Sequence, residues 1–241
     1  MVDTDLPTHA QLRAALQTVQ QSDNGGLGFH MWASVVDRSG IVVAIAYSGE
    51  AEGDQWPASR LISAQKANTA NSLSLDGFAL STANLYAATQ PGGSLFGLQA
   101  SNPVNTSVAY EGDANFYGTP ADSLIGNRIG GINLFGGGLA LYNSSGDVVG
   151  GLGVSGDYSC ADHIIAWKVR NALELDYVPS GVDPTVFPGK PGDDNIIYDI
   201  DLTTGKSASG WGHPSCTSST TQIGRSLPTD FPVRRPKNST T

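Results

Sequence analysis

A glycine-rich stretch at 135–175 constrains the fold of this chain more than any other feature. Within it, short apolar runs at 139–143 and 148–154 flank a turn that contains a glycine. Two short strands around a glycine-containing turn predict an antiparallel β-hairpin. The chain then breaks at Ser155-Gly156 and enters a predicted helix over 159–177. This helix has to fold back over one face of the hairpin.

The predicted helix has two unlike faces. One face carries an apolar stripe with helical spacing, which we expect to pack on the sheet: Ala161, Ile165, Val169 and Ala172. The opposite face carries polar and aromatic side chains, which we expect to point outward: His163, Trp167, Arg170 and Glu174. The sequence therefore predicts an amphipathic helix with an aromatic and basic row facing away from the sheet.

The rest of the chain supplies partners for this unit. A capping box at Thr8 and Gln11 begins a predicted helix over 8–20, and alternating side chains predict a second hairpin over 29–47. A further helix follows the Trp56-Pro57 start signal. The order helix, hairpin, helix, loop, hairpin, helix predicts an α+β fold, an antiparallel sheet of about five strands flanked by helices.

Two long segments lie outside these elements. After a short predicted helix at 78–89, residues 92–131 are rich in Gly, Asn and Pro, and a loop of this length usually has a function or covers something. The C-terminal part is a proline-punctuated tail with one predicted strand at 195–202. We therefore divide the chain into a domain at 1–177 and an extension at 178–241 that wraps this domain or a neighbouring subunit.

The charge balance excludes one class of partner. The chain has a formal net charge of −9 with 15% charged residues, whereas non-specific nucleic-acid binding needs a concentrated basic surface. No run of about 18 apolar residues is present. We expect neither nucleic acid nor a membrane as a partner.

The N-terminus and the cysteines leave two interpretations of the compartment. The sequence MVDTDLPTHAQ lacks the basic and apolar parts of a signal peptide, which fits a cytosolic protein or a mature exported form. Cys160 and Cys216 could form one disulfide, which an oxidising compartment permits. Because the chain is poor in charge and rich in Ser and Thr, we expect a periplasmic or extracellular location over a cytoplasmic one.

Three runs of this sequence resemble one known family. The runs are ISAQKANTANSL, GGGLALYNSSGDVVGGLGVSGD and CADHIIAWKVRNAL. Over about residues 8–175 they are similar to the GlcG/HbpS-like family, a haem-degrading or haem-binding domain also found at the end of some PduO-type proteins. The resemblance implies a profilin-like fold, a ring-like or higher oligomer, and haem or iron binding in several members. It implies no fixed reaction, and the 92–131 loop and the tail depart from the family pattern.

Two motif matches lead to no function. Residues 151–156 satisfy G-x-G-x-x-G, and Asp176 follows at the distance of a dinucleotide-binding site. However, Asp176 ends a predicted helix, where that fold requires the end of a second parallel strand. Ser155 lacks the final glycine of the nucleophile elbow of serine hydrolases. We therefore predict neither nucleotide binding nor serine hydrolysis.

The turn at Ser155 has a better use as an anion site. Backbone N–H groups of Gly156 and Asp157 lie at a predicted helix start, where unpaired donors favour a carboxylate or a haem propionate. The alternative is that Asp157 simply caps the helix. Lys66 is the natural complement, because a lysine on an apolar helical face either extends to solvent or is held against an anion.

The histidines are the candidate haem ligands. His163 and Arg170 share the outward helix face with Trp167, which suits a flat porphyrin with its propionates, although an oligomer contact is the simpler interpretation. We expect His9 and His213 at the surface and His30 partly buried. No metal-binding motif occurs, so no metal site is predicted. Four tail carboxylates are expected to form a solvated acidic face: Asp193, Asp194, Asp199 and Asp201.

These observations predict an oligomeric ligand-binding protein. It would hold haem or a small carboxylate between the Lys66 helix and the Ser155-Gly156 turn. The alternative is an enzyme on a small organic substrate, with Lys66 as clamp or base, Tyr110 or Tyr117 as proton donor and 92–131 as a lid. A third interpretation is a scaffold whose tail locks subunits together.

Overall fold

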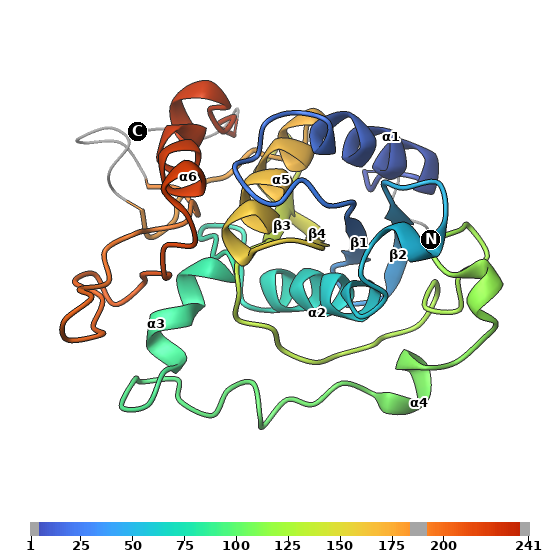
Figure 1. Ribbon diagram of the computed structural model, residues 1–241, viewed down its shortest axis with the longest axis horizontal. Coiled ribbons are helices and arrows are strands. Elements are labelled where there is room, and N and C mark those ends of the chain that lie inside the picture. The colour runs from blue at the N-terminus through green and yellow to red at the C-terminus, as the bar shows by residue number, and fades with distance from the viewer. Residues whose placement is uncertain (1–4, 184–191, 237–241) are drawn as a thin grey trace.

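An antiparallel sheet forms the centre of the computed structural model, which describes residues 5–183 and 192–236 (Figure 1). Its four strands lie in the order β2-β1-β4-β3, and every neighbouring pair is antiparallel. The strands are β1 (Trp32–Asp37), β2 (Val42–Tyr47), β3 (Gly138–Tyr142) and β4 (Val148–Ser155). The two predicted hairpins are therefore confirmed, and β1 and β4 pair at the centre of the sheet.

Helices cover both faces of the sheet. One face packs against α2 (Ser59–Ser72), and the other packs against α1 (His9–Gln20) and α5 (Ser159–Ala172) (Figure 1). In the tail, α6 (Ser218–Asp230) packs against α5. Every residue of β4 is buried because this strand is covered on both faces.

Glycines in β4 allow α2 to lie very close to the sheet. A Cβ atom added to Gly151 would clash with the carbonyl oxygen of Ala67, and one added to Gly153 would clash with that of Ser63. Only a residue without a side chain leaves this space. The glycines of this stretch thus set the distance between α2 and β4.

The long loop is less irregular than its composition suggests. It contains two short helical turns, α4 (Thr106–Ala109) and η3 (Ala114–Phe116), and the segment before it contains η2 (Ala83–Leu85) and α3 (Tyr86–Thr89). A further turn, η1 (Glu52–Asp54), lies before α2. The long loop also protects an edge of the sheet, because Val42 of β2 donates to the Asn127 carbonyl and accepts from the Gly126 N–H. In the described part of the chain, no helix is long and apolar enough to span a bilayer.

Four expectations about secondary structure need correction. The sheet has four strands instead of about five, and the predicted strand at 195–202 contributes only an isolated bridge between Ile200 and Ser207. The predicted helix at 159–177 ends at Ala172, since Glu174 adopts a positive φ of 58° and turns the chain. The helix predicted at 78–89 is limited to η2 and α3. Helix α6 was not predicted, because its Ser- and Thr-rich sequence contains Gly224 and Pro228, two residues that disfavour a helix interior.

Candidate functional site

Lys66 lies beside the corner where β4 leads into α5. Its Nζ donates to the Asp162 carboxylate at 2.6 Å and to the Val154 carbonyl at 3.1 Å. The other oxygen of Asp162 accepts from the backbone N–H groups of Gly156 at 3.1 Å and Asp157 at 3.0 Å. The lysine and the amide-rich corner are therefore brought together, and the carboxylate between them belongs to the chain itself.

With Asp162 in this position, the corner is closed to solvent. The Asp162 side chain is 4% exposed and that of Lys66 is 2% exposed. Burial raises the pKa of Asp162 to about 6, against the opposing effect of the Lys66 charge. Lys66 lines none of the five most prominent cavities in the described residues. Ligand binding by Lys66 and its neighbours stays a prediction.

The two remaining predicted residues of this corner have local partners as well. The Asp157 carboxylate accepts from the backbone N–H groups of Leu27 at 2.7 Å and Gly28 at 3.0 Å. It therefore anchors the loop before β1, in addition to accepting from the N–H of Tyr158. The Ser155 hydroxyl donates to Ser59 Oγ at the start of α2. Both side chains tie the corner to neighbouring elements.

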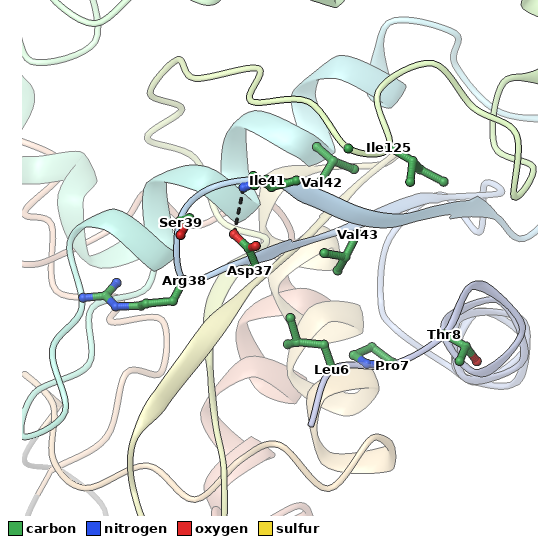
Figure 2. A pocket seen from close by; sticks show the side chains of 11 residues that line it. Leu6, Pro7, Thr8, Asp37, Arg38, Ser39, Ile41, Val42, Val43 and Ile125 are labelled. Carbon is green, nitrogen blue, oxygen red and sulfur yellow. Dashed lines mark hydrogen bonds between the residues drawn. The ribbon is translucent and has the colours of Figure 1, made fainter. Parts of the chain in front are cut away.

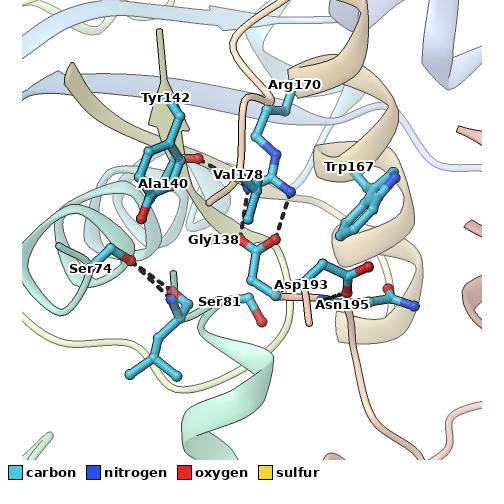
Figure 3. Close-up of polar contacts among 12 residues, drawn as sticks. Ser74, Ser81, Gly138, Ala140, Tyr142, Trp167, Arg170, Val178, Asp193 and Asn195 are labelled. Carbon is cyan, nitrogen blue, oxygen red and sulfur yellow. Dashed lines mark hydrogen bonds and ion pairs between the residues drawn. The ribbon is translucent and has the colours of Figure 1, made fainter. Parts of the chain in front are cut away.

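Three of the four residues that we expected to face outward are buried, so this expectation was wrong for His163, Trp167 and Arg170, whereas Glu174 lies beyond the end of α5 and is exposed. His163 and Arg170 are fully buried and Trp167 is 1% exposed. The tail covers all of them. Arg170 donates from two nitrogens to the Asp194 carboxylate at 2.7 Å each and to the Ala140 carbonyl at 3.1 Å (Figure 3).

Neither ring nitrogen of His163 is accessible to a ligand in this arrangement, because the side chain is fully buried. Its Nε2 accepts from the Ile196 N–H at 3.1 Å and lies 3.2 Å from Asn195 Oδ1, while Nδ1 has no partner. Burial lowers the pKa of His163 to about 3, so the ring is neutral. Haem does not fit at His163 and Arg170 while the tail encloses them. Their role as cofactor-binding residues stays a prediction.

Other tail residues are also less exposed than expected. Asp193 and Asp194 are buried, which contradicts a solvated acidic face. Burial raises the pKa of Asp193 to about 7. Only the outer pair, Asp199 and Asp201, fits the expectation, and hydrogen bonds within their own turn lower the pKa of both carboxyls.

His213 is the second corrected histidine. We expected it at the surface, but it is 2% exposed and stacks at 5.3 Å from the Tyr86 ring. Its Nδ1 donates to the Pro214 carbonyl at 2.8 Å, and its Nε2 accepts from the Gly136 N–H. Burial lowers the pKa of His213 to about 4. His213, a residue of the tail, is thus neutral and contacts the glycine-rich segment before β3.

A cavity of about 650 Å³ lies beside the turn between β1 and β2 (Figure 2). Its walls include the apolar side chains of Leu6, Val43 and Ile125. The polar groups at its rim already have partners. Asp37 accepts from the Ile41 N–H, and Arg38 points away from the cavity toward Asn71 and Ser74. The two charged side chains at this cavity are therefore already engaged in hydrogen bonds within the protein.

A second cavity, of about 410 Å³, opens between α2 and the long loop. At its base the Arg60 guanidinium is buried, donates to Asp122 from Nε at 2.9 Å, and lies 3.5 Å from the centroid of the Tyr117 ring. Tyr110 is 72% exposed, and its hydroxyl has no partner among the described residues. The remaining lining residues are Glu52, Pro57, Ala58, Leu61, Ile62, Gln65 and Ala109.

This cleft brings together part of the predicted enzyme site. Tyr110 and Tyr117 both line it, at the inner side of the long loop. Lys66 does not line it, because that side chain extends toward β4 and α5. The predicted combination of lysine and tyrosine is therefore not assembled around one cavity. Sequence reasoning missed Arg60, although the Asp122 that holds it lies in the long loop itself.

Comparison with known proteins gives a family assignment. The sequence model of a family described as haem degrading protein HbpS-like matches residues 8–170. A crystal structure of a PduOC complex with haem is similar at 24% identity, covering 69% of this chain and 94% of that chain with a TM-score of 0.47. A Klebsiella pneumoniae protein, ORFY, of family model DUF336, is similar at 25% identity, covering 72% and 97% with a TM-score of 0.47.

No curated protein matches the chain. The family match spans α1, the whole sheet, α2 and most of α5, and it ends before the tail begins. It also contains the first two sequence runs of the resemblance in full and the third as far as Arg170. Because the match covers more than half of the chain, the protein belongs to the HbpS-like family of haem-degrading proteins.

Proposed function

We propose that this protein binds haem in the cleft between α2 and the long loop. Membership of the HbpS-like family supports haem as the ligand. The observation that carries the choice of site is Tyr110, whose phenol lines a partly apolar cavity and has no partner in the part of the chain that the structure describes. Pockets of this kind, apolar with a few placed polar groups, are the usual sites for small ligands and cofactors.

The lining residues suit the chemistry of a metalloporphyrin. A tyrosine oxygen is one of the axial ligands that proteins supply to haem iron, so Tyr110 would be the iron ligand. The apolar side chains of Pro57, Leu61 and Ile62 would contact the macrocycle. When bound, haem iron supplies a Lewis-acidic centre that a phenolate oxygen stabilises. The Arg60 charge lies at the base of the cleft, where Asp122 holds the guanidinium in place.

The sites predicted from the sequence serve this proposal less well. Asp162 occupies the position between Lys66 and the amide-rich corner. His163 and Arg170 are covered by Asp194 and Asn195 of the tail. The α2 cleft needs neither of these regions to open, and its phenol is already accessible to solvent. We prefer the α2 cleft because a ligand can reach it, whereas the sites at Lys66 and at His163 are buried.

Titration of the purified protein with haemin, followed by its Soret absorption, tests the proposal. We expect saturable binding by the wild type and a loss of about tenfold or more in affinity for Tyr110→Phe, since only the ligand oxygen is removed. Tyr158→Phe is the matched control, because Tyr158 is also exposed, at 42%, but lies at the start of α5. Equal affinities for the wild type and Tyr110→Phe would exclude this site.

Self-association and export are further parts of the proposal. Three large side chains are exposed close to the start of β1 and α2, as in a subunit contact: Leu27, Phe29 and Trp56. Light scattering at the monomer mass would contradict an oligomer.

The Cys160–Cys216 disulfide supports an oxidising compartment. Trapping of free thiols in fractionated cells tests this location, since cytosolic protein would contain both thiols reduced.

A further inference from the structure

The disulfide between Cys160 and Cys216 connects α5 to the tail across 56 residues of sequence. Cys160 lies in the first turn of α5 and is fully buried. Cys216 is only half-buried and lines an open groove of about 550 Å³. The other groove residues are Ser215, Thr217, Ser218, Thr221, Gln222 and Arg225. A small thiol can therefore approach the Cys216 sulfur but not the Cys160 sulfur.

The disulfide fastens the segment that covers α5. Asn195 and Ile196 contact the His163 ring, and the Trp167 indole N–H donates to the Phe231 carbonyl just after α6 at 2.9 Å. These tail residues all lie beyond residue 170, where the family match ends. The sheet, α1 and α2 lie within the match. The tail thus lies outside the matched region, packs against the core through Leu227, and is cross-linked to α5 by the disulfide.

We propose that Cys216 is a site of thiol–disulfide exchange with small anionic thiols, and that opening of the bond uncovers the α5 face formed by His163, Trp167 and Arg170. A thiolate attacks Cys216 Sγ, the bond between the two protein sulfurs breaks, and Cys160 leaves as a thiolate that takes up a proton. A second thiolate then attacks the mixed disulfide and releases Cys216. In total, two small thiols are oxidised to one disulfide while the protein disulfide is reduced to two thiols.

Two features of the site favour this direction of attack. Arg225 gives the groove a positive charge and forms none of the ion pairs found in the described residues. A thiol that carries carboxylates is therefore favoured over a neutral thiol. The departing Cys160 thiolate lies in the first turn of a 14-residue helix, where the positive end of the helix dipole stabilises an anion.

Mass spectrometry of the folded protein tests the exchange step. With reduced glutathione, we expect a mixed disulfide that peptide mapping locates on Cys216. Arg225→Gln should slow the reaction with glutathione about two- to fivefold and leave the reaction with 2-mercaptoethanol unchanged. Lys206→Gln, a change at another exposed cation of the tail, should alter neither rate. A mixed disulfide on Cys160, or equal slowing with both thiols, would overturn the assignment.

Hydrogen exchange tests whether the cover opens. On reduction, we expect faster amide exchange in peptides that contain residues 163–170 and in α6, with unchanged exchange in β1 and β4. Cys216→Ser should give the same pattern without a reductant. If that variant does not fold, reduced wild-type protein under native conditions supplies the comparison. Unchanged exchange in α5, or an equal increase across the whole sheet, would rule out a separable cover.

Discussion

The ammonium group of Lys66 and the carboxylate of Asp162 are 2.6 Å apart and almost completely removed from solvent. The pair joins α2 on one side of the sheet to the start of α5 on the other, past the end of β4. A buried charge is tolerated only when it is paired and hydrogen-bonded. Asp162 meets this condition through two backbone N–H groups in addition to Lys66.

Removal of one partner of this pair should destabilise the fold strongly. In Lys66→Met, the Asp162 carboxylate stays buried without its cation, and breaking a buried pair in this way costs about 3–5 kcal/mol. We expect a decrease of this size in the free energy of unfolding, measured by urea titration. Lys206→Met, which changes an exposed lysine, should have an effect below about 0.5 kcal/mol.

The double variant Lys66→Met, Asp162→Asn separates pairing from packing. Asparagine keeps an oxygen that can accept from Gly156 or Asp157, and the double variant leaves no unpaired charge. It should therefore be more stable than Lys66→Met alone. Additive losses from the two substitutions would show that the side chains do not depend on each other.

The close contact between β4 and α2 gives a second prediction. Gly153→Ala would place a methyl group against the carbonyl oxygen of Ser63, so the helix has to move away from the strand. We expect a loss of about 2–4 kcal/mol in unfolding free energy, as for overpacking of a rigid core. Gly53→Ala has open space around the added atom and should change stability by less than about 0.5 kcal/mol. Similar effects of the two substitutions would contradict the packing argument.

The parts of this fold that depend on local sequence could be predicted. Alternating side chains and glycine turns identify both hairpins, and the capping box at Thr8 and Gln11 is formed as expected. For Lys66 the sequence left two alternatives open, extension to solvent or pairing with an anion, and the structure pairs it with Asp162. The sequence could not identify this partner, because a ligand carboxylate and an aspartate in the first turn of α5 satisfy the same requirement.

The orientation of α5 could not be predicted from the helix alone. Ile165 and Val169 of its apolar stripe pack in the core with the sheet, but Arg170 is neutralised by Asp194, which lies 24 residues further along the chain. No periodicity in either segment specifies this pairing. A polar helical face looks the same in the sequence whether water or a complementary segment covers it. The free Tyr110 hydroxyl had the same ambiguity, since exposure depends on the path of the long loop.

Arg60 gives a third prediction, about the long loop. Asp122 accepts from its guanidinium and from the Gly118 and Leu124 N–H groups, and Tyr117 stacks on it. In Asp122→Ala these contacts are lost together and Arg60 is left with the Ala109 carbonyl and Ser123. We expect limited proteolysis to cut residues 104–123 much faster than in the wild type. Asp113→Ala, at an exposed turn of the same loop, is the control, and equal cleavage would refute the role of Asp122.

The buried histidines give a prediction for acidic pH. Burial lowers the folded-state pKa of His213 to about 4, below its ordinary value of 6.5. Between these values the unfolded chain binds a proton that the folded protein does not, so the His213 contribution to stability falls as the pH decreases. By pH 5 this loss amounts to about 2 kcal/mol. His163, with its pKa lowered to about 3, acts in the same direction, whereas the raised pKa values of Asp162 and Asp193 oppose it.

Comparison with His213→Gln isolates one histidine from these competing groups. Glutamine can still donate to the Pro214 carbonyl and accept from the Gly136 N–H, but it does not titrate. Urea unfolding of both proteins at pH 7.5 and pH 5 should show that the wild type loses about 2 kcal/mol more on acidification than the variant. The other titrating groups are present in both proteins, so their effects on the unfolding free energy cancel in the comparison. If the wild type and the variant lose the same unfolding free energy, His213 takes up its proton in the folded state. The tail is then displaced from the Gly136 run in acid.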